Sequence, residues 1–143
     1  MASKTLSRLN KRQYAALVRH IWTRENVRCF DGRLRAMPNI KIYDDMDLGA
    51  FYLSVQAARG TLAINRAAAC NGNVIYLRNT IIHEMIHQEQ SQHASPIICA
   101  EHHGRFFRRR AAQIVYLIGY DVVGMYPMRG TPGFFFKHNP AEK

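Results

Sequence analysis

Cysteine is scarce in this sequence of 143 residues. The chain has three cysteines, Cys29, Cys70 and Cys99, which lie far apart, and no two of them form a CxxC pair. An odd number of scattered cysteines argues against a disulfide framework and against a zinc site made of four cysteines. We expect all three to be small buried thiols.

Long apolar runs are missing as well. The longest ones, such as residues 114–118 and 134–136, are far shorter than the ~20 residues that a membrane helix needs. The N-terminus has basic residues but no apolar core, so it lacks the pattern of a secretory signal. We therefore expect a cytoplasmic or nucleic-acid-associated protein with no membrane partner. The chain length suits a single domain.

Acidic residues are the third scarce class. The sequence has 20 Lys and Arg against 10 Asp and Glu, which gives a formal charge of +10. Such an excess favours association with polyanions, nucleic acid first. The candidates for phosphate contact lie on one predicted helix, on or beside the side opposite its apolar stripe: Arg105, Arg108, Arg109 and Arg110. A solvated helix face is the alternative interpretation.

The first half of the chain changes from a helix pattern to strand patterns. Apolar residues at helical spacing predict a helix over residues 7–25. The pair Asp31-Gly32 then marks a turn. Three short segments, rich in β-branched or aromatic residues and separated by turn-like residues, predict a small three-stranded sheet: 39–45, 50–55 and 60–65.

Two further helices follow the strands. Asn73 can cap the first of them, whose apolar positions continue until Pro96 ends the pattern. The second is predicted over residues 101–118. Residues 119–143 form a tail rich in Gly, Pro and aromatic residues, for which a hairpin and an irregular cover over the core are equal alternatives. This set of elements predicts the α+β class.

The helix that Asn73 caps carries the most specific motif of the sequence. His83, Glu84 and His87 match H-E-x-x-H. Residues four apart on a helix differ by about 40° in direction and ~6 Å in rise, so both imidazoles can reach one Zn²⁺ at ~2.0–2.1 Å. Glu84 lies beside the metal, where a carboxylate can act as general base. The competing interpretation is a helix with two histidines and no metal.

A catalytic zinc site usually has three protein ligands and one open position, and the sequence offers four candidates for the third ligand. His93 sits at the spacing of the metzincin motif H-E-x-x-H-x-x-G-x-x-H, but Gln90 replaces the glycine that lets the chain turn. If the helix continues, His93 points away from the metal. Glu101 and His102 are two further candidates.

His103 is the candidate that helix periodicity favours. It begins a stripe whose other members are all apolar: Phe107, Ala111, Ile114 and Ile118. Because this stripe must face the core, we expect His103 to face it too. A buried histidine needs a partner, and a metal held by the neighbouring helix is one such partner. A hydrogen bond to the backbone is the alternative.

Four segments resemble the SprT-like zinc metallopeptidases. The segment "NTIIHEMIH" (79–87) is similar to the active-site helix of that family, and "HGRFF" (103–107) is similar to its third-ligand element. The segments "CFDGRL" (29–34) and "TLAIN" (61–65) resemble the elements that precede the metal helix. The resemblance covers residues 15–118.

The resemblance implies a compact zincin-like α+β core within a single domain over residues 1–143. It implies zinc held by His83, His87 and His103, with Glu84 as general base for hydrolysis of peptide bonds in a protein or peptide substrate. Eukaryotic members of the family cleave proteins crosslinked to DNA, which adds DNA to the expected partners. The chain lacks the cysteine zinc ribbon that follows the core in many members.

Two other classes of function stay open. One is a non-catalytic module that keeps zinc for stability and binds nucleic acid or a protein assembly. The other is a basic structural or interaction protein without a metal. For the enzyme, an additional donor to the substrate carbonyl, such as Tyr116 or Tyr120, is left unassigned.

Overall fold

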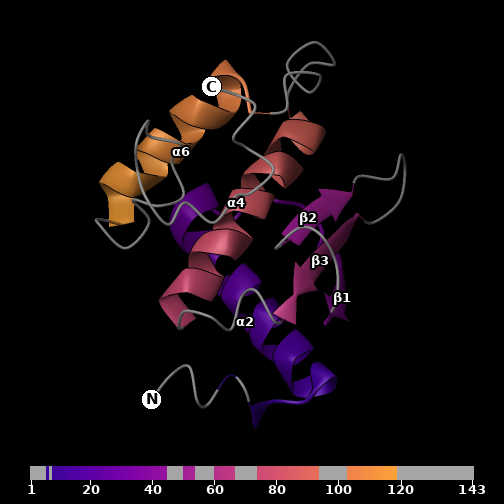
Figure 1. Cartoon of the computed structure of the whole chain (residues 1–143). Helices are drawn as coiled ribbons and strands as arrows, with labels where there is room; N and C mark the ends of the chain where they lie inside the picture. The colour runs from indigo at the N-terminus through magenta and orange to yellow at the C-terminus, as the bar shows by residue number, and fades with distance from the viewer. Residues whose placement is uncertain are drawn as a thin grey trace.

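The computed structural model describes residues 6, 8–44, 50–53, 60–66, 74–93 and 103–118. Its elements in chain order are α2 (Lys11–Phe30), β1 (Asn39–Tyr43), β2 (Ala50–Leu53), β3 (Thr61–Asn65), α4 (Val74–His93) and α6 (Arg105–Ile118). Figure 1 shows α4 at the centre, between the sheet on one side and α6 on the other, with α2 crossing behind it. This mixture of helices and sheet agrees with the predicted α+β class.

Helix α2 has well-defined signals at both of its ends. The side chain of Asn10 accepts a hydrogen bond from the backbone N–H of Gln13, and the Gln13 side chain accepts one from the backbone N–H of Asn10. This capping box fixes the first turn. At the other end Asp31 and Gly32 adopt the left-handed conformation, and the Gly32 N–H donates to the carbonyl of Asn26.

These end signals correct the predicted bounds of the first helix. It was expected over residues 7–25 and is found over Lys11–Phe30. The apolar stripe alone does not show where the caps lie. The capping box at Asn10 determines where the helix begins, and the left-handed Asp31 determines where it ends. The added last turn brings Cys29 and Phe30 into the core.

The sheet has the strand order β1-β3-β2. Strand β1 pairs with β3 in parallel, with Ile40 opposite Leu62 and Ile42 opposite Ile64. Strand β2 pairs with β3 antiparallel. Residues 62–65 of β3 are buried at four consecutive positions, as expected for a central strand that is covered on both faces. The expected strands over 39–45, 50–55 and 60–65 correspond to β1, β2 and β3.

Helix α4 is buried along most of its length. Every residue from 79 to 90 is buried. Its apolar members, which pack into the main core, are Leu77, Ile81, Ile82, Met85 and Ile86. A helix surrounded by protein must also bury its polar positions, and each buried polar group needs a partner. The H-E-x-x-H residues of α4, His83, Glu84 and His87, therefore lie in the interior of the molecule.

Helix α6 covers α4 with the stripe of Phe107, Ala111 and Ile114, all of which are fully buried. The sequence pattern predicted His103 on the first turn of a helix over residues 101–118. The helix in fact begins at Arg105, so His103 lies in the turn that precedes it. The inward direction that the stripe gave to His103 is nevertheless correct, because the side chain is buried.

Several sequence predictions fall outside the described residues. These are the cap at Asn73, the stop at Pro96, the thiols of Cys70 and Cys99, and the tail over 119–143. Among the described residues, no helix combines the length and the apolar character that a membrane crossing requires.

Candidate metal centre

Helix α4 presents His83 and His87 on one face, one turn apart. His83 is fully buried, and His87 is 8% exposed. Residues four apart on a helix project in nearly the same direction, and the two rings meet edge to face with centroids 5.0 Å apart. The H-E-x-x-H motif therefore places two imidazoles together in the interior.

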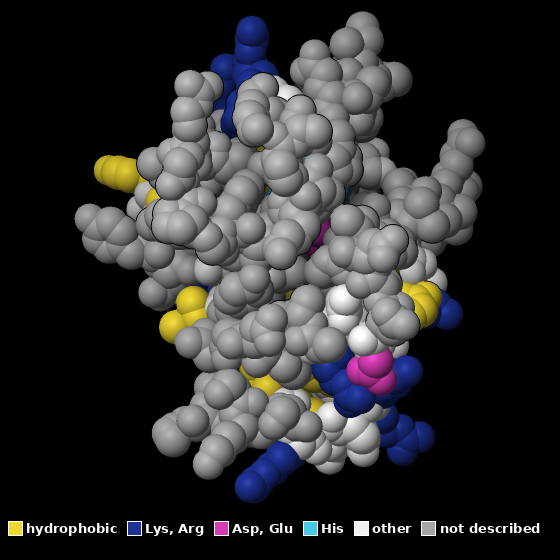
Figure 2. Space-filling view, viewed as in Figure 1, with side chains coloured by type: hydrophobic (Ala, Val, Ile, Leu, Met, Phe, Trp, Pro, Cys, Tyr) yellow, Lys and Arg dark blue, Asp and Glu magenta, His cyan; other side chains and the backbone are white. Residues whose placement is uncertain are grey.

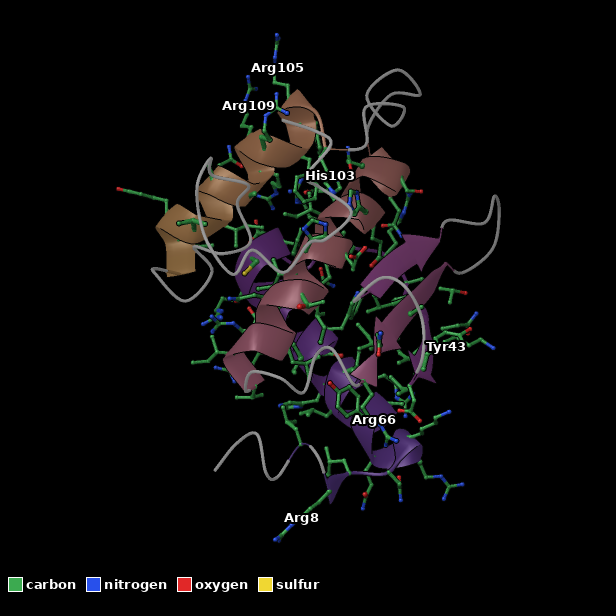
Figure 3. The ribbon with its side chains drawn as sticks, in the orientation of Figure 1. Arg8, Tyr43, Arg66, His103, Arg105 and Arg109 are labelled. Atoms are coloured by element: carbon green, nitrogen blue, oxygen red, sulfur yellow. The ribbon has the colours of Figure 1, made fainter. Side chains whose placement is uncertain are left out.

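His103 completes a triad of histidines. Its Nε2 atom lies 3.1 Å from Nε2 of His87 and 3.2 Å from Nε2 of His83. The ligand atoms of the three residues all lie within 4.8 Å of one another, and all three side chains are buried. Figure 3 shows His103 between the start of α6 and helix α4. We call His83, His87 and His103 the histidine triad.

The spacing of the triad suits a single metal ion. Two nitrogens bound to one tetrahedral zinc at ~2.05 Å are about 3.3 Å apart, close to the observed 3.1 and 3.2 Å. Three imidazole nitrogens facing one another offer lone pairs to a cation and too few protons to satisfy one another. Three histidines with an open fourth position are a common donor set for a catalytic metal, and imidazole suits several transition metals.

Gln90 orients one of the three ligands. Its Oε1 atom lies 2.8 Å from Nδ1 of His87. A carbonyl oxygen can only accept, so the Nδ1–H of His87 is the donor and its Nε2 carries the lone pair. The sequence prediction treated Gln90 only as a departure from glycine in the metzincin motif, and missed this contact.

Phe107 packs against all three rings of the triad. Its ring centroid lies 4.7 Å from that of His83, 4.8 Å from that of His87 and 4.7 Å from that of His103. Phe107 is fully buried. It fixes the ring planes and excludes water from one side of the centre, and a dry wall of this kind strengthens electrostatic interactions there. The motif "HGRFF" thus supplies both a ligand and its support.

Glu84 lies beside the triad. Its Oε2 atom is 3.9 Å from Nε2 of His83, and the side chain is buried. The carboxylate is one position after His83 on the helix, so it borders the centre without being one of the three converging ligand atoms. This position is compatible with the general base that the motif predicts.

Among the described residues, no other candidate ligand from the sequence lies at the triad. Helix α4 continues without a break through Gln90 to His93, so the sharp turn of the metzincin motif is absent there. The side chain of His93, and the whole of Glu101 and His102, lie outside the described residues. Tyr116 is 93% exposed, which keeps it away from the buried centre, and Tyr120 is not described.

The four arginines predicted to contact phosphate divide into two groups. Arg105, Arg108 and Arg109 are exposed, and Figure 3 shows Arg105 and Arg109 projecting away from the body of the molecule at the start of α6. Figure 2 shows dark blue side chains at the same end. Arg108 also donates to the carbonyl of His103 at 2.8 Å, so it supports the turn that carries the third histidine.

Arg110 is held inside a second polar cluster. Its Nε donates to Glu89 at 2.8 Å and its Nη2 donates to the carbonyl of Cys29 at 2.8 Å. Its guanidinium carbon also lies 5.1 Å from the ring centroid of Phe30. Arg33 donates to the other oxygen of Glu89 at 2.8 Å. We call Glu89, Arg33 and Arg110 the Glu89 clamp.

Within the Glu89 clamp, Arg110 links α6 to α4 and to the end of α2. Arg110 has 18% of its side chain exposed, and Glu89 has 4%. Its guanidinium is therefore largely occupied by α4 and by the end of α2, and less accessible to phosphate than those of Arg105 and Arg109. The sequence placed Arg110 on a flank of the helix, and that flank faces Glu89.

Cys29 agrees with the expectation of a buried thiol. It is free and buried, and its Sγ lies 3.4 Å from Oε1 of Glu25. Burial, followed by the charge of Glu25, raises the pKa of the Cys29 thiol to about 12. The thiol therefore stays protonated at neutral pH and does not offer a thiolate to a metal or an electrophile.

Comparison with known proteins adds no relative. No family model, no curated protein and no solved structure matches the chain. The assignment of a function therefore depends on the residues of the centre themselves.

Proposed function

We propose that this protein is a zinc-dependent metallopeptidase that hydrolyses peptide bonds. His83, His87 and His103 would hold the zinc ion, and Glu84 would be the general base. The observation that carries the proposal is the convergence of three buried Nε2 atoms, 3.1 and 3.2 Å apart, with a carboxylate oxygen 3.9 Å from one of them. Three neutral ligands and an adjacent buried carboxylate are the set that metal-assisted hydrolysis uses.

The chemistry divides between the ion and the chain. A bound zinc ion supplies Lewis acidity, which polarises the substrate carbonyl and lowers the pKa of a water molecule toward ~7. Glu84 takes a proton from the attacking water onto its carboxylate and then transfers it to the leaving amine. The rings of the histidine triad that would hold the ion are packed against Phe107.

The family we propose is the SprT-like metallopeptidases, with a zincin-like core. The proposal is supported by a metal helix preceded by a small sheet and followed by a turn that supplies the third histidine. It is also supported by Phe107, which stands four residues after His103 and touches all three ligands. Both features belong to segments that resemble the family.

We further propose that the substrate is a protein associated with nucleic acid. The support is positional. Arg105 and Arg109 are exposed at the start of α6, two and six residues after His103, and they project into solvent (Figure 3). A polyanion held by these arginines would lie beside the turn that carries His103, and such contacts are independent of base sequence.

The test compares wild type with Glu84→Gln, a substitution that keeps the shape and removes the base. Both proteins are incubated with an unfolded protein and with a DNA-bound protein, and cleavage is followed by mass spectrometry. Zinc content is measured on the same samples. We expect about one zinc per chain in both proteins and a loss of cleavage of ~10²–10⁴-fold in Glu84→Gln, the range for removal of a general base.

Wild type treated with a chelator, and then resupplied with zinc, is the control for a contaminating protease. Cleavage should disappear with the chelator and return with zinc. If wild type and Glu84→Gln both bind zinc and are equally inert on both substrates, the enzyme proposal fails. The alternative that then stands is a zinc-stabilised, basic, non-catalytic module that binds nucleic acid or a protein assembly.

A further inference from the structure

Gln90 occupies a position that the proposed chemistry leaves without a role. It is three residues after His87 on helix α4, its side chain is only 4% exposed, and its Oε1 atom lies 2.8 Å from Nδ1 of His87. Burying an amide in a helix interior costs free energy unless it is hydrogen-bonded. A residue that brings a polar group to the ring of a metal ligand is a candidate for tuning that ligand.

The chemistry of this contact determines the state of the imidazole. The amide oxygen has no proton to give, so Nδ1 of His87 must carry the hydrogen. In a neutral imidazole the other nitrogen then has the lone pair, and this nitrogen, Nε2, is the atom that faces His103 at 3.1 Å. The opposite tautomer would bring an N–H toward the centre, where it cannot bind a cation.

We infer that Gln90 is a positioning residue that holds His87 in its metal-binding tautomer. The inference rests on the proposed metal site and adds to it the group that prepares one of its ligands. Metal-binding histidines usually donate their second nitrogen to a carboxylate, a backbone carbonyl or water. Here the acceptor is a neutral side-chain amide on the next turn of the same helix, which orients the ring without adding a negative charge to the centre.

The unbroken course of α4 is what makes this contact available. Residues three apart on a helix are neighbours on its surface, and α4 remains helical from Val74 through Gln90 to His93. A glycine at position 90 would offer no side chain to His87. The residue that removes the metzincin turn is thus the residue that supports the second ligand.

The same helix provides a matched control. Gln88 is 1% exposed, its Oε1 accepts from Nε1 of Trp22 at 2.9 Å, and its Nε2 donates to the carbonyl of Ala36 at 2.8 Å. Gln88 and Gln90 are therefore the same residue type, on the same helix and almost equally buried. Trp22 and Ala36, which Gln88 contacts, belong to the scaffold, whereas His87, which Gln90 contacts, is a member of the triad.

The experiment compares Gln90→Leu and Gln88→Leu in the full chain. Zinc affinity is measured by competition with a chromophoric chelator, and the visible spectrum of the Co²⁺-substituted protein reports the coordination. We expect Gln90→Leu to lower zinc affinity by about 10–100-fold, the usual effect of losing such a partner, and to alter the Co²⁺ spectrum. Gln88→Leu should leave both the affinity and the spectrum at wild-type values, even if it lowers the melting temperature.

A third variant tests rescue. Glutamate at position 90 still offers an acceptor to Nδ1 of His87, so Gln90→Glu should restore the zinc affinity that Gln90→Leu loses. If Gln90→Leu binds zinc as tightly as Gln88→Leu and gives the same Co²⁺ spectrum, the inference is overturned while the proposed metal site stands. If wild type itself binds no zinc, the proposed function and the inference fall together.

Discussion

Two polar clusters are built on buried residues of the same helix, and they are built in opposite ways. The histidine triad joins α4 to the turn before α6, and the Glu89 clamp joins α4 to α6 and to the segment after α2. In the clamp, one carboxylate receives two guanidinium groups at 2.8 Å, one on each oxygen. In the triad, three atoms of the same kind face one another at 3.1 and 3.2 Å.

The difference separates a cluster of opposite charges from a cluster of like ligand atoms. Both oxygens of the Glu89 carboxylate are paired with guanidinium groups, so this carboxylate needs no further partner. Three imidazole nitrogens are ligand atoms of one kind, and a cation held among them would stabilise their arrangement. A buried group of like donors is therefore stronger evidence of function than a buried ion pair, which mainly stabilises one arrangement of the fold.

The largest effect that separates the clusters is expected from Glu89→Gln. This substitution leaves two guanidinium groups without their carboxylate, and removal of one partner from a buried pair costs ~3–5 kcal/mol of the free energy of unfolding. Urea unfolding measures this loss. Native mass spectrometry of the folded variant, without urea, should still give the zinc content of wild type. Because Arg33 is half exposed and can gain water, we expect the lower end of the range.

Glu84→Gln is the matched substitution at the other cluster. It makes the same chemical change on the same helix at a similarly buried position. We expect Glu84→Gln to lose peptide cleavage. The distinction between the two clusters is contradicted if Glu89→Gln abolishes zinc binding while its free energy of unfolding remains that of wild type.

A smaller effect concerns the thiol next to the clamp. The backbone carbonyl of Cys29 accepts from Arg110, and burial together with Glu25 raises the pKa of the Cys29 thiol from 9.0 to about 12. Because the fold favours the protonated thiol, this contribution to stability is fully present below pH 9 and is lost as the pH rises toward 12. At pH 8 iodoacetamide should therefore leave Cys29 unmodified in the native protein.

Peptide mapping of the alkylated protein measures this reactivity. Addition of denaturant should return the thiol to its ordinary pKa and make Cys29 react at the rate of a free cysteine. Rapid alkylation of Cys29 in the native protein at pH 8 would mean that the end of α2 does offer a thiolate, and would contradict the raised pKa.

The sequence predicted which histidines come together better than which residues surround them. His83, Glu84 and His87 follow from one motif, and His103 follows from a stripe that any buried helix must show. The contact of Gln90 with His87 is local to α4, and the spacing of three residues could have indicated it. The contacts of Phe107 with the rings on α4, and those of Glu89, depend on how elements far apart in the chain pack, which periodicity does not determine. Arg110 shows the same limit, since helix geometry places it on a flank but does not reveal that Glu89 faces it.

The fold was predicted in its elements and less well at their ends. The strands correspond to the expected segments, whereas α2 ends five residues later than the apolar stripe indicated. The left-handed Asp31 sets that end, and a left-handed residue other than glycine is uncommon enough that a sequence pattern seldom predicts it. His103 moved from the helix to the preceding turn for a similar reason, because helix starts depend on local hydrogen bonds.

The most direct test of the metal centre is native mass spectrometry of the purified full chain after zinc addition and removal of excess metal. Wild type is compared with His103→Ala and with His20→Ala, a histidine that is exposed on α2. We predict one zinc per chain in wild type and in His20→Ala, and none in His103→Ala. Zinc retained by His103→Ala, or absent from wild type, would contradict a metal centre built from the histidine triad.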